Sequence, residues 1–345
     1  MKERDIYFDN LKFILILLVV VGHLIEPFNS ERWMGTVYQF IYSFHMPLFI
    51  FTAGYFSKRI QYPKYYISLL SGLVVPYFIF ETLYTLFDYY MQGLDLLDFT
   101  YFYPYWILWF LFSMMLWKML LPYLLMLKYP LIICIALSVL LGYSIDVDYY
   151  ASISRTLYFL PFFLIGYYFK REWLSAFKTR SFRLMSIAIL TGGFALLYSL
   201  SPILQTNASW FYGAMPYLEF GLESWNAGLY RILTYAFTAL MGLCFLSIIP
   251  ETRQPYTERG LYTMYVFLLH GFIVKTMQYN RWLETTFQST GGKLLLILLG
   301  VILTWMLSSP WIKRGFGWIV EPNVEPLFKE QIRRRPKNVL KQEEY

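Results

Sequence analysis

Long apolar runs alternate with short polar segments along this chain. The runs have about the 17–25 residues that an α-helix needs to cross a hydrocarbon core of ~30 Å. Strands of a membrane barrel would alternate apolar and polar residues instead, so the pattern predicts helices. Ten spans are predicted, at 11–28, 36–56, 65–87, 104–122, 127–143, 153–169, 184–200, 228–248, 261–278 and 293–312. The expected fold class is all-α, a polytopic integral membrane helical bundle.

The composition agrees with a membrane protein. Only 15% of the residues are charged and 58% are hydrophobic, whereas a soluble domain carries about 25% charged residues. We expect one integral membrane domain at 1–320, followed by a short charged cytoplasmic tail at 321–345. The start, MKERDIYFDN, leads into an apolar run without a small-residue cleavage site, so an uncleaved first helix is expected.

The net charge of +7 is distributed unevenly between alternate loops. If the N-terminus is cytoplasmic, the inner segments hold most of the basic residues, including Lys58, Arg59 and the RRRPK run of the tail. The outer loops are mainly acidic or neutral. This positive-inside pattern predicts that both termini are cytoplasmic. It also favours membrane lipids over nucleic acid as partners of the basic residues, and it indicates a multi-pass protein of the plasma membrane.

All three histidines, His23, His45 and His270, lie inside predicted spans. An ionisable side chain is costly in hydrocarbon, so such residues usually face the bundle interior or a wet cavity and have a function there. Cys134 and Cys244 also lie in apolar segments, which argues against a disulfide framework or a cysteine-based metal site. The histidines therefore indicate proton or acyl chemistry, or binding of a metal or haem, within the bilayer. For acyl chemistry no metal is expected.

The first span places Lys12 and His23 on one stripe. They are eleven residues apart, which is three helical turns plus roughly 20° and a rise of about 16 Å. Lys12 is expected at the cytoplasmic interface and His23 near mid-membrane. A cation at the mouth and a base in the middle suit a long ligand with an anionic head and a reactive far end, such as acyl-coenzyme A. Glu26 continues the stripe and is a candidate to orient His23.

The second span contains a proline two residues after His45. Pro47 lacks an N–H and disrupts a helix locally, which frees a carbonyl about four residues earlier, near Ser43. The break predicts a polar pocket beside His45, although an ordinary proline kink explains the same residues. The longest outer loop, at about 201–227, is rich in aromatic residues and is a candidate lid or acceptor-binding surface.

Several motifs occur in chain order. They are Lys12-x10-His23, FIYSFHMPLFIFTAGYFSKR at 40–59, YWILWFL at 105–111, LPFFLIGY at 160–167 and YVFLLH at 265–270. Together, from about residue 4 to residue 312, they resemble the acyltransferase-3 family of integral membrane O-acyltransferases. FHMPLF is similar to the branch of fucose 4-O-acetylases and exopolysaccharide acyltransferases. The chain departs from the family in using Lys12 rather than arginine and in having no clean Arg-x-x-Arg element.

The resemblance implies transfer of an acyl group, most simply acetyl, from cytoplasmic acyl-CoA. The acceptor would be a hydroxyl of a bacterial cell-surface polysaccharide or lipid-linked glycan. Histidine can act as a base near neutral pH, so His23 is the expected base or acyl relay, with Glu26, His45 and His270 as further catalytic candidates. The expected coenzyme A contacts are Lys12, Lys58, Arg59 and Lys64, and the expected acceptor contacts are Arg155 and Arg231. Glu81, another acid within a span, is expected to pack or to form hydrogen bonds.

Two other functions remain open at this point. A transporter or exporter of a glycan or acyl intermediate would use the histidines and glutamates as a proton relay, and it would not consume acyl-CoA. A haem protein would use two histidines as axial ligands and would show a Soret band. No feature of the sequence sets an oligomeric state.

Overall fold

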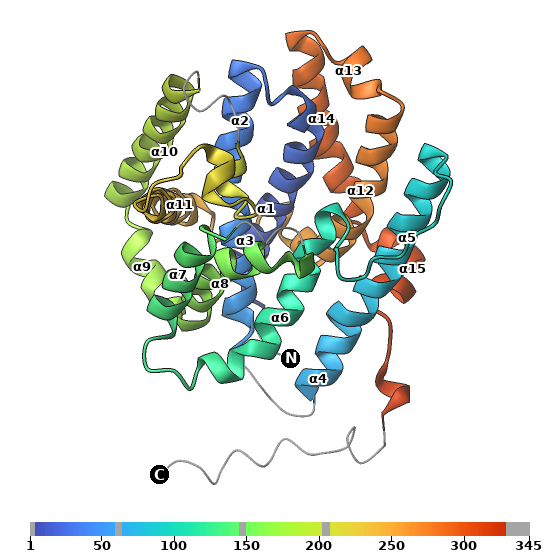
Figure 1. Ribbon diagram of the computed structural model, residues 1–345, viewed down its shortest axis with the longest axis horizontal. Helices are drawn as coiled ribbons and strands as arrows, with labels where there is room; N and C mark the ends of the chain where they lie inside the picture. Colours follow the sequence, from blue (N-terminus) through green and yellow to red (C-terminus); the bar gives the residue numbers. More distant parts are fainter. Residues whose placement is uncertain (1–3, 59–63, 145–149, 202–207, 329–345) are drawn as a thin grey trace.

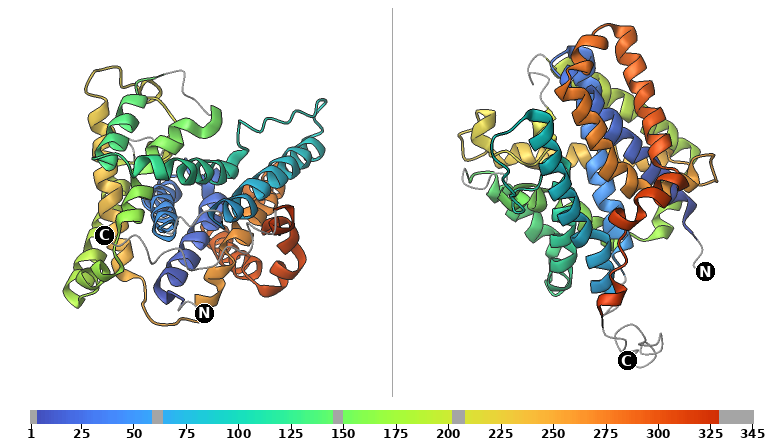
Figure 2. Two further views of the ribbon diagram at one scale, coloured as in Figure 1. Left: turned by 90° about the horizontal axis from the view of Figure 1, so that it is seen from below. Right: turned by 90° about the vertical axis from the view of Figure 1, so that its right-hand side faces the viewer.

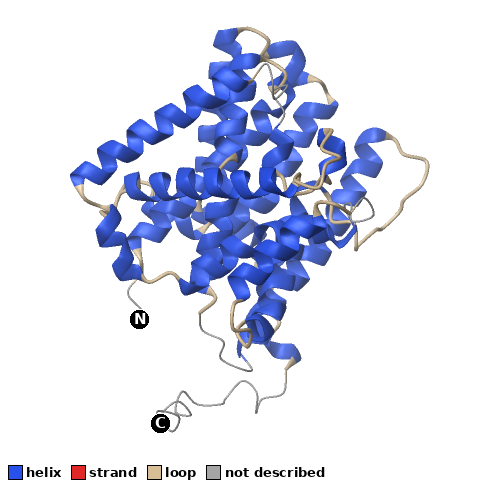
Figure 3. Ribbon diagram, turned by 60° about the vertical axis from the view of Figure 1, so that its left-hand side comes forward, coloured by secondary structure: helices blue, strands red, loops and turns tan. Residues whose placement is uncertain are grey.

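The computed structural model describes residues 4–58, 64–144, 150–201 and 208–328. These residues form a bundle of helices and connecting loops, and Figure 3 shows no strand among them. The all-α class predicted from the hydrophobic pattern is therefore confirmed. Arg59 and most of the predicted tail, residues 329–345, lie outside the described residues.

Within the described residues, six helical segments are long and apolar enough to cross a membrane, by length and composition. They are α1 with its following 3-10 turn (Ile6–Phe28), α4 to α5 (Tyr65–Gln92), α6 with its preceding turn (Trp106–Leu124), α10 (Arg180–Leu200), α11 (Gly228–Ile248) and α14 (Thr290–Leu307). Each coincides with a predicted span. The protein is thus a helical membrane bundle.

The other four predicted spans fall on shorter helices. They are α2 (Arg32–Tyr42) with α3 (His45–Phe56), α7 (Pro130–Leu141), α8 (Ile153–Tyr168) and α12 (Thr263–Tyr279). Three short helices complete the described chain, α9 (Leu174–Phe177), α13 (Trp282–Thr286) and α15 (Pro310–Val320). The count of ten spans and the cytoplasmic position of both termini stay predictions.

Helix α1 (Ile6–Ile25) lies in the interior of the bundle, beside α2, α3, α12 and α14 (Figures 1 and 2). Its N-terminal end is tied to the segment after α11. The Tyr7 hydroxyl donates to the Leu246 carbonyl at 2.9 Å, and Asn10 donates to the carbonyls of Pro250 and Thr252, each at 2.9 Å. These bonds fix the position of α1 along its own axis. The residues of the stripe from Lys12 to His23 therefore have fixed positions along that axis.

Helices α3 and α8 touch backbone to backbone through two glycines. A Cβ on Gly54 would lie 2.0 Å from the Phe163 carbonyl oxygen, and one on Gly166 would lie 1.9 Å from the Phe51 carbonyl oxygen. Small residues allow such close approach between membrane helices. The contact fixes α3, which carries His45 at its first position, against α8.

The break predicted in the second span is confirmed. Helix α2 ends at Tyr42 and α3 begins at His45, with Phe44 outside helical geometry at φ −140°. Pro47 cannot supply the N–H that the Ser43 carbonyl would receive in a continuous helix. The gap brings Tyr42 and His45 close to one another, with ring centroids 4.6 Å apart.

Candidate active site

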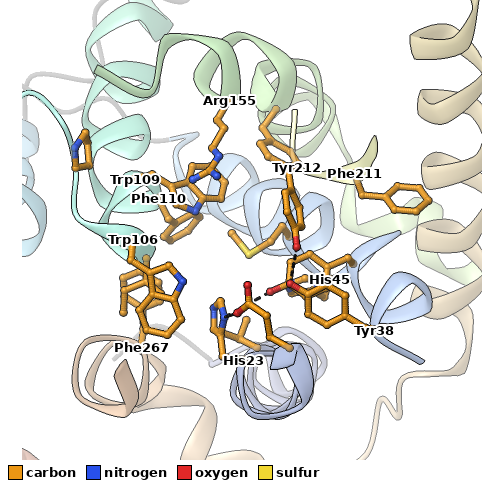
Figure 4. Close-up of a pocket in the computed structure, with 17 residues that line it drawn as sticks. His23, Tyr38, His45, Trp106, Trp109, Phe110, Arg155, Phe211, Tyr212 and Phe267 are labelled. Atoms are coloured by element: carbon orange, nitrogen blue, oxygen red, sulfur yellow. Dashed lines mark hydrogen bonds and ion pairs between the residues drawn. The ribbon is translucent and has the colours of Figure 1, made fainter. Parts of the chain in front are cut away.

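Three distant segments bring the histidines together. His23 comes from α1, His45 from the start of α3 and His270 from α12. The rings of His23 and His270 are 5.6 Å apart and nearly parallel, and Tyr42 lies between His23 and His45. His23 and His45 line a pocket of about 350 Å³ (Figure 4). Its other lining residues are Val19, Glu26, Tyr38, Tyr42, Met46, Pro104, Trp106, Ile107, Trp109, Phe110, Arg155, Phe159, Phe211, Tyr212 and Phe267.

His23 and Glu26 form a dyad at the floor of this pocket. His23 Nδ1 lies 3.2 Å from Glu26 Oε2, across one turn at the end of α1. An ionised carboxylate can only accept, so Nδ1 carries the hydrogen and Nε2 of a neutral His23 is left to take a proton. The same carboxylate–imidazole arrangement orients the base in catalytic triads. The dyad can therefore act as a general base.

His45 and His270 are held by backbone carbonyls of their own segments. His45 Nδ1 is 2.8 Å from the Ile41 oxygen, and His270 Nδ1 is 2.9 Å from the Val266 oxygen. A carbonyl only accepts, so each Nδ1 donates and each neutral ring presents a bare Nε2. Both residues are buried, and His270 Nε2 has no hydrogen-bond partner within the described chain. Both rings can thus accept a proton but cannot, while neutral, donate one from Nε2.

The wall of the pocket is largely aromatic. The Trp106 ring centroid is 4.5 Å from that of His23, and the hydroxyls of Tyr38 and Tyr212 are 2.5 Å apart. None of these aromatic residues is a candidate site residue from the sequence alone. Trp106 belongs to the YWILWFL motif, and Tyr42 lies three residues before His45. These are the signals that could have identified them. Two residues of the long loop at 201–227, Phe211 and Tyr212, line the pocket, and the role of this loop as a lid or acceptor-binding surface stays a prediction.

The two arginines predicted to contact an acceptor differ in position. Arg155 lines the pocket, and Figure 4 shows it pointing inward from the side opposite His23, next to the Trp109 ring. Arg231 is not among the lining residues. It is buried and donates to the carbonyls of Ser138 and Met215. The structure thus brings Arg155 to the histidine pocket, and Arg231 connects Met215 of the loop before α11 to Ser138 of α7.

Lys12 lies at the opposite end of α1 from His23. Its ammonium is 2.9 Å from Asp9, which also receives Arg4 at 2.6 Å. This three-residue cluster carries one net positive charge and remains partly accessible, since the Lys12 side chain is 23% exposed. Lys58 is bound to the Phe169 carbonyl and lies over the Tyr55 ring. Lys64 begins α4, but its side chain is not among those that the structure describes. Arg59 lies outside the described residues.

A smaller cavity of about 80 Å³ lies next to the histidine pocket. Its lining includes Ile16 and Thr263, and it shares four side chains with the larger pocket, Val19, Met46, Phe110 and Phe267. Ile16 is one turn from Lys12 along α1. The part of the predicted stripe from Ile16 through Val19 to His23 therefore borders two adjoining cavities.

Known proteins were compared with the chain. Two nodulation proteins named NolL are similar to one segment of 61 residues, with 44% identity for that of Sinorhizobium fredii and 41% for that of Mesorhizobium japonicum. The segment is 16% of this chain, and 17% and 16% of those relatives. No solved structure matches significantly. The acyltransferase-3 family model, described as an acyltransferase domain, matches residues 5–309, nearly the whole chain. The histidine pocket therefore belongs to a member of the acyltransferase-3 family of membrane acyltransferases.

Proposed function

We propose that the protein transfers an acyl group, acetyl in the simplest case, from cytoplasmic acyl-CoA to a hydroxyl of a cell-surface polysaccharide or lipid-linked glycan. The observation that carries the proposal is the His23–Glu26 dyad, which lines a pocket next to a smaller cavity beside Ile16. The family supplies the reaction class. The positive-inside charge pattern supports entry of the donor at Lys12.

In the proposed step, His23 Nε2 takes the proton of the acceptor hydroxyl. The hydroxyl oxygen attacks the thioester carbonyl, the C–S bond then breaks, and the coenzyme A thiolate takes the proton from His23. Glu26 stabilises the imidazolium that forms between these events. The bare Nε2 atoms of His45 and His270 suit proton acceptance better than stabilisation of the thioester oxygen. The Arg155 guanidinium, a permanent cation in the same pocket, is the better candidate for that developing negative charge.

The donor is proposed to lie along α1. Its anionic head would contact Lys12 and Arg4, and its arm would pass the small cavity beside Ile16 and Val19. The distance of about 16 Å along the helix between Lys12 and His23 suits a head group remote from the reacting bond. Lys58 is a poorer candidate than the sequence indicated, because its ammonium is already held by a backbone carbonyl.

The acceptor is proposed to enter from the side of Arg155 and Tyr212. The tryptophan and tyrosine rings of the wall offer apolar faces for a sugar, and Arg155 offers a cation for a phosphate or carboxylate. The relatives come from Sinorhizobium and Mesorhizobium, which supports a bacterial plasma membrane as the location. A transport function would use the same buried histidines but would leave acyl-CoA intact.

The test uses the full chain in proteoliposomes with acetyl-CoA labelled in the acetyl group and a lipid-linked glycan fraction from the source cells. We expect label to appear in an alkali-labile glycan product together with free coenzyme A. His23→Ala should lower the rate by about 10²-fold or more, the usual contribution of a general base. Folded wild-type protein that moves glycan across the bilayer without consuming acetyl-CoA would overturn the proposal in favour of transport.

A further inference from the structure

We infer that Glu81 is a positioning residue, which holds a strained turn so that the Trp106 ring stays against His23. Glu81 lies on α5 (Val75–Gln92), outside the pocket, and no catalytic step uses it. The inference rests on the proposed role of His23, but the first readout chosen below does not require activity.

The backbone of Trp106 is strained. Its φ is +29°, and among the described non-glycine residues only Ala151, Ser152 and Arg281 also have positive φ. Of these four, Trp106 is the one that lines the histidine pocket. A bulky residue keeps such a conformation only where its surroundings impose it, and strain of this kind is concentrated at functional sites. Something must therefore hold the turn.

Glu81 supplies the restraint. Its carboxylate is 2% exposed, and its two oxygens both lie 3.0 Å from the backbone nitrogen of Tyr105, the residue just before Trp106. A buried carboxylate is costly unless it is hydrogen-bonded. The hydrogen bond that compensates this cost comes from the residue directly before the strained Trp106. The buried carboxylate therefore restrains the backbone at the position of the strain.

The Trp106 ring is held from a second direction. The Lys275 ammonium, on α12, lies 4.7 Å from the ring centroid. No carboxylate of the described chain is within ion-pair distance of Lys275, which faces the rings of Tyr105, Trp106 and Tyr279. Cation–π contacts of this kind stabilise a ring in place. The Trp106 ring is thus held in place. Its centroid lies 4.5 Å from that of His23 and 6.4 Å from that of His270.

The consequence is a rigid wall over two histidines. If the Tyr105 anchor is lost, Trp106 can relax to a negative φ and its ring moves away from His23. His23 then loses its fixed orientation, and His270, which is 0% exposed, becomes accessible from the pocket. We expect a lower kcat with little change in the apparent donor KM, because the donor head group binds three turns away.

Carbethoxylation by diethyl pyrocarbonate tests the wall without any substrate. The chain has only three histidines, so mass spectrometry can follow each one in the full-length protein in nanodiscs. Glu81→Ala should raise the labelling rates of His23 and His270 several-fold. Glu81→Gln keeps an oxygen that can accept from Tyr105 and should label like wild type. Thr85→Ala is the matched control on α5, because its hydroxyl donates only to the Glu81 carbonyl within the described chain.

A second variant keeps the test decisive if Glu81→Ala does not fold. Trp106→Ala removes the ring itself, and it should expose His270 at least as strongly. Wild-type labelling rates in a folded Glu81→Ala protein would overturn the inference, and so would wild-type rates in Trp106→Ala. A loss of thermal stability with unchanged labelling would show a merely structural glutamate. If no variant, including wild type, consumes acetyl-CoA, the proposed function fails while the labelling result still decides the role of Glu81.

Discussion

The Glu26 carboxylate lies three residues beyond His23 and meets its Nδ1 at 3.2 Å, which leaves Nε2 of a neutral His23 able to accept a proton. We predict that Glu26→Gln lowers kcat by roughly 10-fold or more, since the amide can favour the wrong tautomer and does not stabilise the imidazolium. Steady-state acyl transfer measures this effect. The exposed Glu223→Gln is the matched control and should behave like wild type. Unchanged kcat in Glu26→Gln would mean that His23 works without an orienting partner.

Lys12 is predicted to act on donor binding. Lys12→Arg keeps the charge beside Asp9 and should retain most of the activity. Lys12→Gln should raise the apparent acetyl-CoA KM more than it lowers kcat, because the head group is remote from the reacting bond. An acetyl-CoA titration in nanodiscs separates the two constants, with the exposed Lys170→Gln as control. A change in kcat alone would assign Lys12 to His23 or to the fold.

The contact between α3 and α8 predicts a large difference in stability between alanine variants at two glycines. Gly166→Ala places a methyl group 1.9 Å from a backbone oxygen that cannot move aside, and overpacking of this kind costs about 1–3 kcal/mol. Gly192→Ala, in α10, meets nothing within 4 Å and should leave stability unchanged or raised. Melting temperatures in detergent compare the two variants. Equal melting temperatures would contradict the backbone contact.

The topology is testable in intact cells. The distribution of lysine and arginine predicts ten membrane spans with both termini in the cytoplasm. Single cysteines introduced at Lys2 and Lys341, with Cys134 and Cys244 replaced, should resist an impermeant thiol reagent until the cells are opened. A cysteine placed in the outer loop at Glu223 should react at once and serves as the positive control. Reaction at either terminus before lysis would require another arrangement of the spans.

Local features of the sequence predicted the parts of the site that depend on a single helix. The stripe from Lys12 to His23 follows from helical geometry alone, and the break near Ser43 follows from the missing N–H of Pro47. The meeting of His23 with His270 depends on how α1 and α12 pack, which periodicity does not encode. The same limit explains Arg231. Its place at a helix end suggested an acceptor contact, but the carbonyls of Ser138 and Met215 come from elsewhere in the chain.

Trp106 illustrates what a motif leaves out. The motif YWILWFL indicates that a helix begins with aromatic residues. It predicts neither the φ of +29° at Trp106 nor the carboxylate on α5 that accepts from the Tyr105 backbone. Likewise, Glu81 was expected only to pack or to form hydrogen bonds. Its partner is the backbone of residue 105, and a backbone partner leaves no signature in side-chain composition.

The four side chains shared by the two cavities, Val19, Met46, Phe110 and Phe267, have a consequence for the membrane as a barrier. In the proposed reaction, the two substrates arrive from opposite compartments, so a continuous wet path between them would leak protons and ions. Apolar side chains between two cavities resist wetting. If the acyl arm passes from one cavity to the other, we expect these four side chains to separate as it passes and then to close, which would limit leakage of protons and ions.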